Sequence, residues 1–173
     1  NKPGQQIFVI SEDRKRIQAG GALPEDLIKT IIDTTLQSQE ETTAPENLSD
    51  ELRIRDVDGT DHIRGNIDAT VVIVEYSDTS CPFCKTFHNT MKSVMEKYTP
   101  DQLAWVYRNF PIPQLHPNAV NEAHALECAS ELGGNEKFWE YTDAVYEANP
   151  SLQGRAMDQD ILYTLAEDLG LNE

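Results

Sequence analysis

The pair of cysteines spaced two residues apart has the clearest chemical meaning in the sequence. Cys81-Pro82-Phe83-Cys84 follows a β-branched run that begins at Val71, so we expect it where a strand turns into a helix. With Pro82 as the first helical residue, Cys81 takes the N-cap position, where free backbone N–H groups and the helix dipole favour a thiolate. Cys84, one turn later, is expected on the buried face as a thiol. Such a pair exchanges electrons with other thiols through a mixed disulfide.

Two ionisable residues near the motif are candidates for handling its charge and protons. Glu75 lies in the apolar run six residues before Cys81, where a carboxylate is costly without a task or a partner. It is a candidate proton acceptor for Cys84, or else an edge residue that is solvated or paired with Lys85. His88, one turn after Cys84, is either a surface residue of the helix or an electrostatic modulator of the pair.

Three other interpretations of the cysteines stay open. The pair could form a purely structural disulfide, although closing so short a loop stabilises a protein little. Zinc could bind Cys81, Cys84 and His88 with a distant fourth ligand, although the sequence has no second close ligand pair. The distant ligands considered are His116, His124 and Cys128. Cys128 lies among small residues and is expected to be a buried small hydrophobe, or else a regulatory thiol.

The elements that must position the motif can be predicted from hydrophobic spacing. A short strand is expected around Leu52, Ile54 and Val57, a buried strand from Val71, a helix from Pro82 to near Pro100, and a strand from Leu103 to Phe110. A strand, helix and strand in this order form a right-handed unit with parallel strands. Helices are then expected over 118–132, 136–148 and 158–169, each ended by glycine or proline.

The N-terminal part of the chain is expected to form separate elements that are followed by a linker. Residues 7–10 are expected to form a strand, Ser11 to start a helix that ends at Gly20, and residues 24–36 to form an amphipathic helix. Residues 37–50 have the composition of a linker. We therefore divide the chain into an N-terminal extension over 1–36, the linker over 37–50, and one domain over 51–173.

The charge of the chain excludes several classes of function. Fourteen basic and thirty acidic residues give a formal charge of -16, which disfavours binding to nucleic acid or to anionic lipid surfaces. Apolar runs such as Val71 to Val74 are far shorter than the roughly 20 residues needed to span a bilayer. The chain starts at Asn1 without a leader, so we expect any export signal or membrane anchor to lie outside this sequence. We assign no cofactor and no metal.

Several motifs together resemble the DsbA-like family of thiol–disulfide oxidoreductases. The resemblance runs from about residue 60 to 173 and is carried by these segments: His62-Ile-Arg-Gly-Asn, Val71-Val-Ile-Val-Glu-Tyr-Ser-Asp, Cys81-Pro-Phe-Cys-Lys-Thr-Phe-His, Trp105-Val-Tyr-Arg-Asn-Phe-Pro, His116-Pro-Asn-Ala, Glu127-Cys-Ala-Ser and Lys137-Phe-Trp-Glu-Tyr. It implies an α/β, thioredoxin-like fold with a strand-strand-helix-strand core and a helical insertion over 117–170.

The resemblance also implies roles for the residues. Cys81 matches the attacking cysteine, Cys84 its partner, Pro82 and Phe83 the dipeptide that tunes the potential, and Glu75 the buried acid of the preceding strand. We place His88 with the residues that tune the pair. The implied activity is oxidation of unfolded or reduced exported proteins in the periplasm or another extracytoplasmic space, with tethering to a membrane in a longer form. A membrane quinone-linked partner would then reoxidise the pair.

The sequence departs from this family at its C-terminal end. The family continues with a loop containing a cis proline, two strands and a final helix, whereas this chain stops at Leu171-Asn-Glu, so its C-terminal strands are missing. We therefore expect an unpaired sheet edge, which residues 1–36 complete in the same chain or by exchange in a homodimer. The alternatives to an oxidase are a disulfide isomerase or reductase, and a redox-inactive binding module with a structural disulfide or a metal site.

Overall fold

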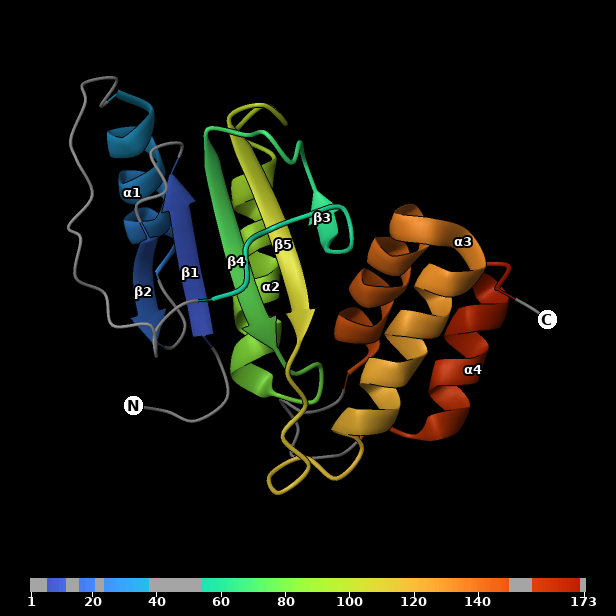
Figure 1. Ribbon diagram of the computed structural model, residues 1–173. Coiled ribbons are helices and arrows are strands. Elements are labelled where there is room, and N and C mark those ends of the chain that lie inside the picture. The colour runs from blue at the N-terminus through green and yellow to red at the C-terminus, as the bar shows by residue number, and fades with distance from the viewer. Residues whose placement is uncertain (1–5, 12–15, 21–23, 38–53, 150–156, 172–173) are drawn as a thin grey trace.

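The computed structural model describes residues 6–11, 16–20, 24–37, 54–149 and 157–171, with side chains from residue 24 onward. The elements are strands β1 (Gln6–Ser11) and β2 (Arg16–Gly20), helix α1 (Glu25–Gln37), strands β3 (His62–Arg64) and β4 (Val71–Ser77), helix α2 (Pro82–Met95), strand β5 (Leu103–Asn109), and helices α3 (Ala119–Ala148) and α4 (Gln159–Asp168). Figure 1 shows them as one sheet with helices beside it and a helical group at one side.

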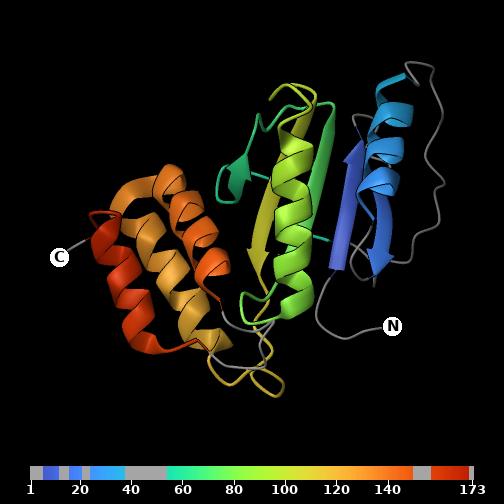
Figure 2. The same ribbon diagram turned by 180° about the vertical axis from the view of Figure 1, so that it is seen from behind.

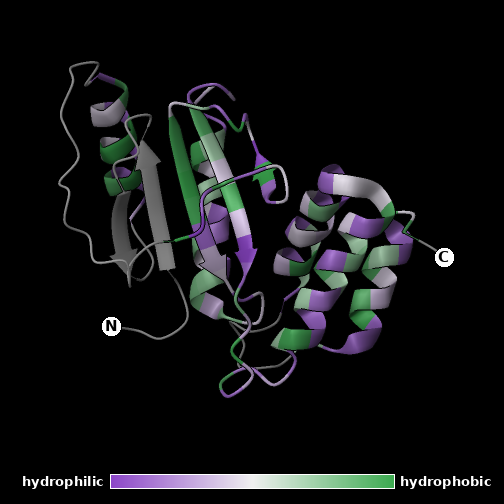
Figure 3. Cartoon of the chain, viewed as in Figure 1, coloured by the Kyte–Doolittle hydropathy of each residue, from purple (hydrophilic) through white to green (hydrophobic). Residues whose placement is uncertain are grey.

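The strands form one five-stranded sheet in the order β2-β1-β4-β5-β3. β4 and β5 are parallel, with Val71 opposite Leu103 and Ser77 opposite Asn109, and α2 makes the crossover between them. The other neighbours are antiparallel. β4 is central and buried on both faces, which explains why its first four residues, Val71 to Val74, are all β-branched and apolar (Figure 3). The predicted thioredoxin-like unit is confirmed.

The main core lies between the sheet and the helices that cover one of its faces. Phe87 and Met91 of α2 and Ile28 and Ile32 of α1 are at most 2% exposed and join the same cluster as Ile73 of β4. The apolar stripe predicted over residues 24–36 therefore packs on the same face as α2, and Figure 2 shows both helices in front of the sheet. At the far side, buried side chains of α3 complete this core.

The opposite face of the sheet is covered by an extended segment that includes Ile54 and Val57. Both pack on a smaller cluster around Val74 and Val106, yet the described part of this segment, 54–61, is not a strand. The predicted strand around Leu52, Ile54 and Val57 was therefore wrong for its described residues, and the first strand of the core is β3 instead. The spacing explains the error, because Val57 breaks the two-residue alternation of a strand.

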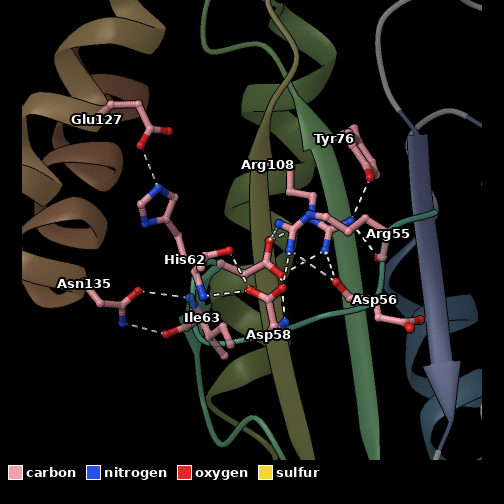
Figure 4. Close-up of polar contacts among 11 residues, drawn as sticks. Arg55, Asp56, Asp58, His62, Ile63, Tyr76, Arg108, Glu127 and Asn135 are labelled. Atoms are coloured by element: carbon pink, nitrogen blue, oxygen red, sulfur yellow. Dashed lines mark hydrogen bonds and ion pairs between the residues drawn. The ribbon is translucent and has the colours of Figure 1, made fainter.

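Arg108 of β5 fastens this segment to the sheet. Its guanidinium donates to both carboxylate oxygens of Asp61, at 2.8 and 2.9 Å. Two further donations go to the backbone carbonyls of Arg55 and Asp56 (Figure 4). It also donates to the Tyr76 hydroxyl at 2.8 Å. An arginine makes five such donations only where acceptors surround it, so this face of the sheet is closed by hydrogen bonds.

The N-terminal residues lie in the same sheet as the cysteine-bearing unit. β1 runs antiparallel to β4, with Gln6 opposite Tyr76 and Ser11 opposite Val71, so the expected open edge is occupied by the same chain. The helix predicted from Ser11 to Gly20 was wrong, because β2 occupies Arg16–Gly20. Residues 11–16 contain no apolar residue and so lack the stripe that holds a helix on a core. The predicted linker over 37–50 lies, from residue 38, outside the described residues.

Three helical stretches follow β5, as the sequence predicted. α3 contains a break at Gly134, whose φ of 72° and ψ of -167° are not helical, so it consists of two helices packed as a hairpin beside α4 (Figure 1). In the part of the chain that the structure describes, no helix is long and apolar enough to cross a membrane.

Candidate functional site

Cys81 lies at the junction between β4 and α2 in the N-cap position that the sequence predicted. Its φ of -82° and ψ of 123° are extended, and Pro82 begins the helix behind it. Its backbone is fixed at both ends, because its N–H donates to the Asp78 carbonyl and its carbonyl accepts from the Lys85 N–H, each at 3.0 Å. The residue is only 3% exposed. Helix geometry therefore directs the sulfur toward the first turn of α2.

The surroundings of Cys81 favour its thiolate. A hydrogen bond from the Cys84 side chain is the largest cause that lowers the Cys81 pKa from its ordinary 9.0 to about 6, while burial opposes the shift. The backbone N–H groups of Cys84 and Phe83 lower the pKa further, as does the charge of His116. At neutral pH the reduced protein therefore carries a thiolate at Cys81, which is the reactive form for nucleophilic attack.

Cys84 has the opposite character. It is 0% exposed, and the pKa of its thiol is raised above the ordinary range by the hydrogen bond to Cys81, by burial and by the Cys81 charge. The Ser77 hydroxyl and the backbone N–H of Asp78 act against this shift. The two sulfurs thus share one proton, which stays on Cys84, as the predicted division between an attacking and a buried cysteine requires.

Glu75 lies in the middle of β4 and is fully buried. Its Oε2 accepts a hydrogen bond from Trp105 Nε1 at 3.0 Å, and its register partner on β5 is Tyr107. The alternative of a solvated edge residue paired with Lys85 is wrong, because Lys85 donates instead to the carbonyls of Glu147 and Asn149. Glu75 is thus a buried carboxyl group of the central strand, two residues before Ser77, and its role as proton acceptor remains a prediction.

His88 is not a surface residue of α2, and that interpretation was wrong. It is 1% exposed, its Nε2 lies 2.8 Å from Asp143 Oδ1, and its ring stacks on Tyr146 with centroids 4.2 Å apart. Burial is the largest cause of its lowered pKa. His88 therefore fixes the position of Tyr146 in the core, and its tuning of the pair stays a prediction.

The loop that carries Cys81 is fixed by acidic residues that the sequence argument did not single out. Glu122 of α3 accepts from the hydroxyls of Thr79 and Ser80, at 2.6 and 2.7 Å. Asp78 accepts at 2.9 Å from the Ser80 N–H and pairs with His116 Nδ1 at 2.9 Å. The short motif that starts at His116 signalled its importance, whereas nothing in the spacing distinguishes Glu122 from the other acidic residues of its helix.

The third cysteine lies away from the pair. Cys128 is exposed on α3, against the expectation of a buried residue, and lines a cavity of about 410 Å³ with Leu132 and Tyr163. None of the three cysteines forms a disulfide in this structure. Across the described residues, no cluster of three or more His, Cys, Asp or Glu side chains could hold a metal ion.

Comparison with solved structures shows the same fold. The thiol–disulfide exchange protein α-DsbA2 of Wolbachia pipientis matches with a TM-score of 0.56 and 21% identity, over 67% of this chain and 56% of that one. ScsC of Proteus mirabilis in a compact conformation matches with a TM-score of 0.55 and 17% identity, over 83% of this chain and 62% of that one. The fold of this chain is therefore that of DsbA-like proteins.

Curated relatives share only part of their length with this chain. The Na⁺/H⁺ antiporter NhaA 1 of Mycolicibacterium vanbaalenii is 38% identical over 93 residues, which are 54% of this chain and 14% of the antiporter. NhaA of Herminiimonas arsenicoxydans is 31% identical over 65% of this chain and 16% of its own length. The chain thus spans about one seventh of these relatives. The thioredoxin family model, by contrast, matches residues 57–170, which include Cys81, Cys84 and the helical insertion, so the chain belongs to the thioredoxin family.

Proposed function

We propose that this protein exchanges disulfides with other proteins through Cys81 and Cys84. The observation that carries the proposal is the pair of contrasting thiols, with a Cys81 pKa of about 6 next to a fully buried Cys84. In the oxidised form, a substrate thiolate attacks the Cys81 sulfur, the Cys81–Cys84 bond breaks, and Cys84 leaves with the electron pair and takes up a proton. A second thiolate of the substrate then attacks the substrate sulfur that is bonded to Cys81. The substrate thereby gains a disulfide, and Cys81 leaves as a thiolate.

The direction we propose is oxidation of unfolded or reduced exported proteins. A stabilised Cys81 thiolate stabilises the reduced form of the pair, which makes the disulfide a stronger oxidant. Such an oxidant operates in an oxidising compartment, so we place the protein in the periplasm or another extracytoplasmic space. A quinone-linked membrane partner would remove the electrons. Glu75 would exchange the proton of Cys84, since it is the buried carboxyl group of the central strand.

The decisive experiment is the equilibrium reduction potential of the pair in glutathione buffers, in a Cys128→Ser background so that only Cys81 and Cys84 respond. Mass spectrometry after alkylation gives the oxidised fraction. We expect a potential at or above about -180 mV, as for a disulfide donor. A value below about -250 mV would instead mean a reductant or a structural bridge and would overturn the oxidase proposal. The Cys81→Ser variant, which cannot form the bridge, is the control.

A further inference from the structure

Three buried hydroxyl groups form a continuous chain beside the cysteine pair. The Ser77 hydroxyl lies 2.8 Å from the Tyr146 hydroxyl, which lies 3.1 Å from the Tyr107 hydroxyl. Each of these residues is at most 1% exposed, and they come from β4, α3 and β5. A hydroxyl group in a protein core costs free energy unless it is paired, so three together indicate more than packing.

The Ser77 hydroxyl, at one end of this row of hydroxyl groups, contacts the sulfur of Cys84. Ser77 hydrogen-bonds the Cys84 side chain, and with the backbone N–H of Asp78 it favours the thiolate of Cys84 over the thiol. The other titratable groups that contact the cluster are Cys81, at the N-cap of α2, Glu75, on β4, and His88 of α2, whose ring stacks on Tyr146. Cys81 opposes a negative charge at Cys84, and Glu75 opposes one at the two tyrosines.

The two tyrosines remain protonated, so they act as hydrogen-bond donors. Burial is the largest cause that raises the pKa of Tyr107 and of Tyr146 well above 10.0, followed by their charged neighbours. Either hydroxyl of each pair can donate, and in the arrangement in which Tyr107 donates to Tyr146 and Tyr146 to Ser77, the Ser77 hydrogen is left to point at the Cys84 sulfur. Hydrogen bonds in such a chain polarise one another, which strengthens the last donation.

We propose that Ser77, held in place by Tyr146 and Tyr107, stabilises the Cys84 thiolate at the moment the disulfide opens. In that step a thiolate bonds to the Cys81 sulfur, the Cys81–Cys84 bond breaks, and the electron pair goes to Cys84. The Ser77 O–H donates a hydrogen bond to the new thiolate, which then takes its proton from a buried acid, Glu75 in the mechanism proposed above. Ser77 touches the reacting sulfur, whereas Tyr146 is a positioning residue. The inference rests on the proposed exchange activity.

This arrangement affects rates and leaves the equilibrium almost unchanged. At equilibrium Cys84 is either in the disulfide or a thiol, since its pKa lies far above neutrality. The thiolate at Cys84 exists only while the ring opens or closes. Removing its hydrogen-bond donor therefore slows opening and closing by the same factor, and the ratio of the two rates, which is the equilibrium constant, stays the same.

The experiment compares Ser77→Ala and Tyr146→Phe with the parent protein, all in the Cys128→Ser background. Stopped-flow reaction of the disulfide form with reduced glutathione gives the opening rate, and reaction of the reduced form with oxidised glutathione gives the closing rate. We expect Ser77→Ala to slow both about three- to tenfold and Tyr146→Phe to slow both by a smaller factor. The equilibrium constant with glutathione should change less than about twofold, and the Cys81 pKa should stay near 6.

Tyr141→Phe is the matched control. Tyr141 is also buried in the helical insertion, but its hydroxyl donates to the Leu162 carbonyl at 2.8 Å, so its removal should cost stability without changing either rate. Unchanged rates in Ser77→Ala, or a slowing in Tyr141→Phe equal to that in Tyr146→Phe, would overturn the inference. Failure of the proposed function is distinguishable, because the parent protein itself would then not react with glutathione.

Discussion

Cys81 and Cys84 lie one helical turn apart, yet the pKa of Cys81 is lowered and that of Cys84 is raised. The free N–H groups of the first turn act on Cys81, while Cys84 lies in the core, and both positions follow from a proline at the start of a helix. The sequence was sufficient to predict this contrast because its largest cause, the hydrogen bond between Cys84 and Cys81, joins two residues of one helical turn. It was not sufficient for Ser77 or Glu122, since their contacts join segments that no local pattern relates.

The titration of Cys81 is the most direct prediction at this scale. Its pKa is lowered in the folded protein, from 9.0 to about 6, so its thiolate contributes stability that is present above pH 9 and is lost as the pH falls through 6. The reduced protein should therefore become more stable between about pH 6 and 9, relative to the oxidised protein, in which neither Cys81 nor Cys84 titrates. Denaturant unfolding of both forms across this range measures the difference, and parallel curves would contradict the prediction.

Glu75 provides a second prediction for a single residue. Glu75→Gln keeps an oxygen to accept from Trp105 Nε1 but cannot exchange a proton. If Glu75 serves Cys84, closing of the ring by the reduced pair should slow about tenfold or more at neutral pH, with the Cys81 pKa little changed. The rate of closing against pH is the measurement. A profile identical to that of the parent protein would remove Glu75 from the mechanism.

At the scale of elements, α3 reaches into the site from outside the sheet. The strands β4 and β5 and helix α2 were predictable because their apolar spacing is regular over many residues, whereas β2 and the 54–61 segment are short and were assigned wrongly. The contacts of α3 with the site were beyond prediction, because its thirty residues include a break at Gly134 and its packing angle is set by tertiary contacts.

Substitution of Glu122 tests whether α3 stabilises the loop before Cys81. Glu122→Ala leaves the hydroxyls of Thr79 and Ser80 without their acceptor, so we expect a loss of about 1–3 kcal/mol in the free energy of unfolding. Glu131→Ala, at an exposed position of the same helix, is the control and should change stability by less than about 0.5 kcal/mol. Equal effects in denaturant unfolding would mean that the loop does not depend on Glu122.

At the scale of the whole molecule, the N-terminal residues and the cysteine-bearing unit share one sheet and one core. The resemblance implied an edge of the sheet without its C-terminal strands, and β1, β2 and α1 occupy that side in this chain. The sequence indicated a strand near residue 7 and an amphipathic helix from residue 24, but not the partner of either. Pairing through a second copy of the chain stays a prediction.

Substitution of Ile32 tests whether α1 shares a core with the cysteine-bearing unit. Ile32 is 0% exposed and Leu27, on the same helix, is 46% exposed. Ile32→Ala should lower the free energy of unfolding by about 2–5 kcal/mol, whereas Leu27→Ala should lower it by less than about 1 kcal/mol. Unfolding followed by the fluorescence of the buried Trp105 reports on the cysteine-bearing unit. If the two substitutions had equal, small effects on that signal, α1 would not belong to this core.

The register of β1 has a consequence for the order in which the protein folds. Ser11 pairs with Val71, so the hydrogen bonds between β1 and β4 close a loop that is much longer than the one between β4 and β5. Closing long loops costs more entropy, and contacts distant in sequence form late. On a ribosome, β1 emerges well before its partner exists. The nascent chain therefore holds the β1–β2 pair with one edge of β1 unpaired until β4 has been synthesised, an interval in which chaperones would have the most to protect.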